Sequence, residues 1–108
     1  MNNGAFTPFG PTYLIGTSEV QVLPSDNNSP TAVRIRNLKA TTQYISWKPA
    51  LPTGGSVSIT VTAPTAGVPS VNTISLLPNS VEVIGISGIA WFKADAAAAF
   101  EVTPGEGL

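Results

Sequence analysis

Residues 56–62 read Ser-Val-Ser-Ile-Thr-Val-Thr, with a hydroxyl side chain at every other position and an apolar β-branched side chain between them. Successive side chains of a β-strand point to opposite faces, so this alternation is typical of a half-buried strand. It predicts that Val57, Ile59 and Val61 point inward and that the serines and threonines point to solvent.

The same alternation in residues 32–38, Ala-Val-Arg-Ile-Arg-Asn-Leu, predicts a second strand of this kind. Its two faces carry Val33, Ile35 and Asn37 on the inner side and Arg34, Arg36 and Leu38 on the outer side. Further candidate strands lie between turn-forming residues, at 12–16, 19–23, 43–48, 73–77, 80–86, 89–94 and 98–103.

Ten glycines and ten prolines separate these short segments. Frequent turns between short alternating segments are typical of a sandwich, a jelly roll or a small barrel. We therefore expect an all-β fold, a single antiparallel β-sandwich or jelly-roll-like domain of about eight short strands. The expected organisation is an extended arm over residues 1–11, the domain over 12–104 and a flexible tail over 105–108. The last two strands, with the alanine-rich turn 94–99 between them, are expected to form a hairpin.

Charged residues make up 10% of the chain, against roughly 25% in an average soluble domain. Small Ser/Thr-rich β-domains share this deficit, but so do domains that are covered by partners, because charge is depleted in the centre of protein interfaces. Five basic residues against six acidic ones leave no broad basic stripe, which argues against nucleic acid as a partner.

The chain has no histidine and no cysteine. The commonest general base, the thiol nucleophile and the usual metal ligands are therefore absent. The carboxylates are expected in turns or on solvent faces, where they would not form a catalytic pair, so we expect no enzyme activity, no metal and no cofactor. No apolar run approaches the ~20 residues that a membrane helix needs, and the start of the chain does not resemble a signal peptide. We expect a protein made in a cytoplasm that does not bind membranes.

Aromatic residues supply the candidate contacts with a partner. Phe6 and Phe9 lie in the expected arm, where exposed phenylalanines would need a docking surface on the domain or on a neighbour. Both tryptophans, Trp47 and Trp91, are expected in the core. Tyr44 and Phe92, which neighbour them on the opposite strand faces, are then expected outside.

Three segments together resemble small structural proteins of tailed bacteriophages. They are the alternating strand 32–38, the Tyr-Ile-Ser-Trp segment 44–47, and the end of the chain, Ala-Trp-Phe-Lys-Ala (90–94) followed by Ala-Phe-Glu-Val-Thr-Pro-Gly-Glu-Gly (99–107). The proteins that they resemble sit beside the major capsid protein as decoration or cement subunits. The resemblance implies a β-sandwich or jelly roll without catalytic residues, located on the outer surface of the virion capsid after synthesis in the host cytoplasm. It also implies two partners, the major capsid protein and further copies of the chain in a homo-dimer or homo-trimer.

Apolar arm residues, surface aromatics and a short basic run are the expected contacts with the capsid or another partner. They are Phe6, Phe9, Arg34, Arg36, Lys39, Tyr44 and Phe92. Two other interpretations remain open: a head-fibre or tail subunit anchored by the arm, and a receptor- or carbohydrate-binding β-module that uses Tyr44 or Trp47 as a sugar platform.

Overall fold

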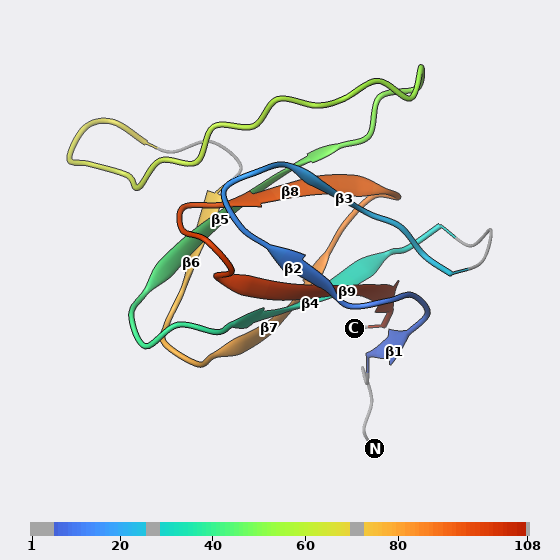
Figure 1. Ribbon diagram of the computed structural model, residues 1–108, viewed down its shortest axis with the longest axis horizontal. Coiled ribbons are helices and arrows are strands. Elements are labelled where there is room, and N and C mark those ends of the chain that lie inside the picture. Colours follow the sequence, from blue (N-terminus) through green and yellow to red (C-terminus); the bar gives the residue numbers. More distant parts are fainter. Residues whose placement is uncertain (1–5, 26–28, 70–72, 108) are drawn as a thin grey trace.

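The computed structural model of the chain describes residues 6–25, 29–69 and 73–107. Within these ranges the secondary structure is entirely β, and no helix long and apolar enough to cross a membrane occurs. Nine strands follow one another along the described chain (Figure 1). They are β1 (Thr7–Pro8), β2 (Tyr13–Ile15), β3 (Val20–Val22), β4 (Ala32–Asn37), β5 (Gln43–Pro49), β6 (Thr73–Leu76), β7 (Val81–Gly85), β8 (Ala90–Ala94) and β9 (Phe100–Glu106).

The strands form two antiparallel sheets that face each other. Sheet A has the order β1-β9-β4-β7, with β2 also paired to β9, and sheet B has the order β3-β8-β5-β6. The pairs are nested along the chain: β2 pairs with β9, β3 with β8, β4 with β7 and β5 with β6. A long antiparallel ribbon wrapped into two sheets in this way is a jelly roll, so the predicted all-β sandwich of jelly-roll type is confirmed.

Alternate residues of each strand fill the space between the sheets. In β4 the predicted inward residues Val33, Ile35 and Asn37 are fully buried, while Arg36 is exposed. The same alternation applies in the partner strands, because residues directly opposite each other in an antiparallel pair share a face. The largest buried apolar side chains are Phe92, Phe100, Ile15, Ile35, Ile45 and Leu76.

Asn37 is a fully buried polar residue, and it joins the two sheets. Its Nδ2 group lies 3.0 Å from the carbonyl oxygens of Thr41 and Leu76 and 3.1 Å from that of Leu77. Its Oδ1 accepts a hydrogen bond of 2.8 Å from the Lys39 amide. A buried amide costs little only when its polar atoms are paired, and Asn37 meets this condition by tying the end of β4 to the end of β6.

The expected final hairpin is wrong. β8 belongs to sheet B and β9 to sheet A, so the alanine-rich turn between them crosses from one sheet to the other. The crossing lies against the end of β2, where the Ala99 amide donates to the carbonyl of Ile15 at 3.0 Å and the Ala94 amide to that of Gly16 at 2.8 Å. Ala98 has a φ of 50° in this turn, in the left-handed region that costs an L-residue about 1–2 kcal/mol.

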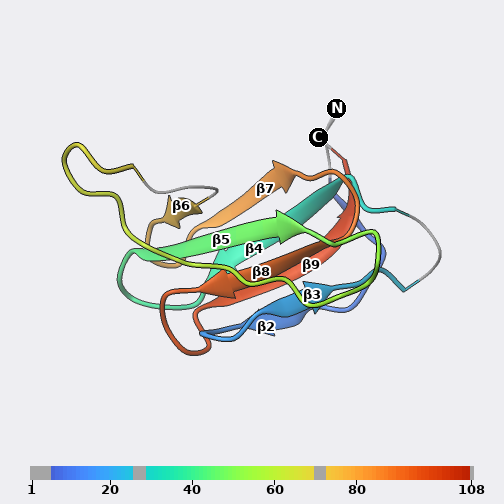
Figure 2. The same cartoon turned by 90° about the horizontal axis from the view of Figure 1, so that it is seen from above.

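The prediction of a strand over residues 56–62 is also corrected. Val57 and Ile59 are buried while Ser58 and Thr60 are exposed, as predicted, but the segment is not a strand of either sheet. We call residues 56–61 the strap. The strap is extended and runs across the outer face of sheet B, as a third layer above β5, β8 and β3 (Figure 2).

Both ends of the described chain are held more firmly than expected. Within the expected arm, β1 pairs with Gly105 and Glu106, and the Phe9 amide donates to the carbonyl of Pro104 at 3.1 Å. Phe6 lies over Gly105, where an added Cβ would be 2.6 Å from the phenyl ring. Gly105 and Glu106 therefore belong to β9 and not to a flexible tail, and the first five residues of the arm lie outside the described ranges.

Candidate functional site

The two outer faces of the sandwich differ in what covers them. The strap covers the outer face of sheet B, whereas no described segment lies in the same way across the central strands of sheet A (Figure 1). The uncovered face carries the outward residues of β2, β9, β4 and β7. We define it as the sheet A face, and it consists of Leu14, Arg34, Arg36, Val81, Val83 and Glu101.

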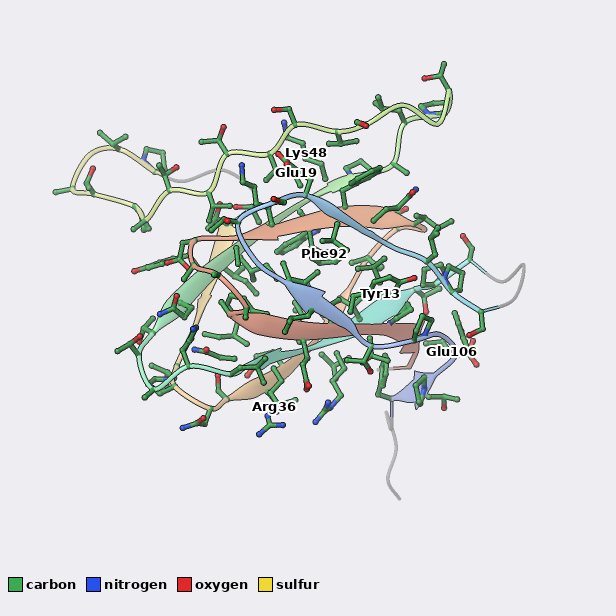
Figure 3. All side chains as sticks on the ribbon, viewed as in Figure 1. Tyr13, Glu19, Arg36, Lys48, Phe92 and Glu106 are labelled. Carbon is green, nitrogen blue, oxygen red and sulfur yellow. The ribbon has the colours of Figure 1, made fainter. Side chains whose placement is uncertain are left out.

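Apolar side chains flank a central charged pair on the sheet A face. Leu14 is 59% exposed and Val81 is 41% exposed, which are large values for apolar side chains of strands. Between their two strands, a guanidinium nitrogen of Arg36 lies 3.8 Å from a carboxylate oxygen of Glu101. Both charged side chains are well exposed, so the ion pair contributes little to folding and remains available to a partner. Arg36 points away from the sandwich (Figure 3).

Arg34 borders a groove at the end of this face, beside the arm. The groove has a volume of about 520 Å³ and is lined by Phe6, Pro8, Gly10, Thr12, Arg34 and Thr103. Its wall is fixed where the hydroxyls of Thr12 and Thr103 hydrogen-bond at 2.8 Å. The structure therefore brings two of the predicted contact residues, Phe6 and Arg34, to one place.

The other predicted contact residues are distributed differently. Arg36 lies on the sheet A face, and Phe9 is half-buried where the arm meets residues 104 and 25. Lys39 follows β4 and is half-buried. Tyr44 lies on the other side of the molecule, on the outer face of sheet B, where its backbone is bonded to Asp95.

Phe92 is not a surface contact. It is fully buried and stacks on Trp47, with ring centroids 6.2 Å apart and an interplanar angle of 26°. Its opposite neighbours in the sheet, Val20 and Trp47, both point inward, and this register sets the direction of Phe92. Trp91 consequently points outward, so the expectation of a core position holds for Trp47 and fails for Trp91.

The strap is attached to sheet B mainly through charged side chains, which lie beneath it (Figure 3). The Ile59 amide donates to a carboxylate oxygen of Glu19 at 2.9 Å, and the Lys93 ammonium donates to the Ile59 carbonyl at 2.9 Å. The same ammonium lies 3.4 Å from that Glu19 oxygen. The ion pair thus occupies the place that a peptide group of a neighbouring strand would take.

These contacts lower the pKa of Glu19. The hydrogen bond from the Ile59 amide, helped by the amide of Glu19 itself and by the charge of Lys93, lowers the pKa of Glu19 below its ordinary value of 4.5. Sequence reasoning missed Glu19, Lys93 and Lys48 as functional residues, because single charges at strand ends and outward positions read as ordinary solvated side chains. Lys48 also reaches the strap, through a 2.9 Å hydrogen bond to the Ser58 carbonyl.

The indole of Trp91 lies between these lysines. Trp91 pairs with Lys48 across the sheet and is two residues from Lys93 on the same face, so it lies under the strap. Its Nε1 is buried and has no hydrogen-bond partner among the residues that the structure describes. No three acidic side chains of the described residues come together as a metal site would require. The sheet A face, the groove beside the arm and the strap are the candidate binding surfaces.

Comparisons with known proteins found no match: no family model, no curated protein and no solved structure matches the chain.

Proposed function

We propose that the chain is a non-enzymatic structural subunit of a tailed-bacteriophage virion, a decoration protein that binds the major capsid protein from the outside and stabilises the head. The observation that carries the proposal is the contrast between the two outer faces. One is covered by the strap of the same chain, and the other exposes Leu14 and Val81 around the Arg36–Glu101 pair.

The composition and the fold support the same role. Jelly rolls are widely used by viral capsid proteins and lectins, although a fold by itself does not define a function. The chain has neither histidine nor cysteine, and its charged fraction of 10% suits a surface that is partly buried in an assembly.

The proposed contact combines apolar burial with a charge pattern. Burial of Leu14, Val81 and the groove beside Phe6 contributes about 25 cal/mol for each Å² of apolar area removed from water. Arg34 and Arg36 face acidic groups of the capsid and set orientation more than affinity. Self-association into a dimer or trimer adds valency, so that modest contacts hold the subunit firmly on a lattice of identical sites.

Sedimentation with capsids made without this protein tests the proposal. The purified chain is expected to bind these capsids stoichiometrically and to raise the temperature at which they open. A variant with both Leu14→Asp and Val81→Asp is expected to lose binding, whereas Ser75→Asp, an exposed position on the opposite face, keeps it. Failure of the wild-type chain to bind capsids contradicts the proposal, and retained binding by the double variant shows that the contact lies elsewhere.

A further inference from the structure

The strap has two edges, and the charged side chains of sheet B contact them differently. In an extended segment, the N–H and C=O groups of alternate residues point to opposite edges. Both groups of Ile59 are held by the Glu19–Lys93 pair, whereas the opposite edge belongs to Ser58 and Thr60. On that edge, the Ser58 carbonyl accepts from Lys48, and no other backbone group of these two residues has a hydrogen-bond partner among the described residues.

A groove lies along this second edge, between the strap and the end of β5. It has a volume of about 510 Å³ and is lined by Lys48, Pro49, Leu51, Ser56, Val57 and Ser58. Leu51 is 46% exposed at its end. The groove therefore offers an apolar lining, one ammonium group and an unfilled row of backbone donors and acceptors.

The connection that contains the strap is unusually long. It covers residues 50–72 between β5 and β6, whereas most connections in compact domains have about 4–6 residues and longer ones are often functional. A segment of strong β-propensity without a partner strand is also a template for another chain. An unfilled strand edge beside a groove is the geometry by which extended peptides are bound through strand addition.

We propose that the strap binds an extended acidic segment of a partner polypeptide, which pairs as a strand with Ser58 and Thr60 and places a carboxylate beside Lys48. A polypeptide backbone in extended conformation presents donors and acceptors at the spacing of this row. When a backbone N–H of the incoming strand donates a hydrogen bond to the Ser58 carbonyl, it replaces the Lys48 ammonium as the donor to that oxygen. The ammonium then needs a new acceptor, and a carboxylate of the incoming strand supplies it.

This surface is separate from the sheet A face, because the two lie on opposite sides of the sandwich (Figure 1). The strand-addition proposal therefore does not rest on the proposed virion role. Both surfaces can be occupied in one assembly, with one holding the subunit to its support and the other holding an extended segment of a neighbour.

Synthetic peptides of alternating valine and threonine, with blocked ends, test the inference by amide NMR titration of the full chain. One peptide carries a central glutamate, a second carries lysine there and a third carries proline. The glutamate peptide is expected to shift the amides of Ser58 and Thr60 in a saturable manner and to bind about threefold to tenfold more tightly than the lysine peptide. The proline peptide, which lacks a backbone donor, is expected to bind least.

Protein variants separate strand addition from simple charge attraction. Thr60→Pro removes a backbone donor on the free edge and is expected to abolish binding, whereas Thr60→Ala keeps the backbone and binds like the wild type. Lys48→Met is expected to remove the preference for glutamate over lysine while leaving weak binding. If Thr60→Pro shifts amides beyond the strap, the comparison is repeated at the other residue of this edge, with Ser58→Pro as the test variant and Ser58→Ala as its control. The inference is overturned if no peptide gives saturable shifts, if the shifts map to another edge such as β7, or if the proline variants bind like the alanine variants.

Discussion

The ammonium group of Lys93 donates a hydrogen bond of 2.9 Å to the carbonyl of Ile59, and this contact joins a sheet to a segment that belongs to no sheet. Its companion is the bond from the Ile59 amide to Glu19. The two charged side chains hold the backbone N–H and C=O of one residue of the strap, Ile59, whose side chain is buried against the outer face of sheet B.

Acid is expected to loosen the strap. The pKa of Glu19 in the folded chain lies below 4.5, so the contact is fully present above that pH and is lost as the pH falls through the depressed folded value. The amide proton of Ile59, followed by NMR, is expected to titrate in this acidic range. Glu19→Gln should abolish the titration, and an unchanged Ile59 profile in that variant would contradict the assignment.

Replacement of Asn37 is expected to destabilise the domain strongly. Asn37→Leu keeps the branching of the side chain but removes the donor to the carbonyls of Thr41 and Leu76, whereas the Leu77 carbonyl keeps its bonds from Ser80. Each buried polar group left unpaired costs about 1–3 kcal/mol, so we expect a loss of about 2–4 kcal/mol in urea unfolding. The control is Gln43→Ala, which removes only an exposed bond to the Thr41 hydroxyl and should cost less than about 0.5 kcal/mol.

The aromatic pair in the core gives a prediction about Phe92. Phe92→Leu removes the stacking on Trp47 and leaves a small void, with an expected loss of about 1–3 kcal/mol and a weaker near-ultraviolet circular dichroism signal. Tyr44→Leu, at a half-buried outward position of β5, should change the free energy of unfolding by less than about 1 kcal/mol. Equal effects of the two substitutions would place Phe92 outside the core.

The turn between β8 and β9 contains a local strain that substitution can relieve. Ala98 has a φ of 50°, which glycine adopts without the steric cost of a Cβ. We expect Ala98→Gly to raise the free energy of unfolding by about 0.5–1 kcal/mol in chemical denaturation. Ala97→Gly, next to it and equally exposed, should lower the free energy by a similar amount, and a stabilising effect at both positions would exclude relief of backbone strain as the cause.

The sequence predicts the fold class well because alternation reports which side of a strand is buried. This signal placed Val33, Ile35 and Asn37 correctly, and it also identified Val57 and Ile59 as buried. It carries no information on the backbone partner, so a strap lying over a sheet and a strand inside a sheet read alike. The failed hairpin has the same origin, because neighbouring strands can pair with each other or cross between sheets, and only the packing of the whole chain decides.

The prediction that Phe92 points outward failed for a different reason. In residues 90–94 two aromatic side chains are adjacent, so the sequence allows either Trp91 or Phe92 to point inward. The register with β3 and β5 selects Phe92. Glu19 and Lys93 were beyond sequence reasoning because they lie 74 positions apart and meet only through the nested pairing of the strands.

The position of β9 makes the order of sheet A depend on the synthesis of residues 100–106. This strand, the last along the described chain, is the shared partner of β1, β2 and β4, so β1 and β2 have no partner strand in sheet A until residues 100–106 have been synthesised. A chain released early would keep its apolar strands unpaired and would be a substrate for proteolysis. A chain that lacks β9 would therefore not present an ordered sheet A face.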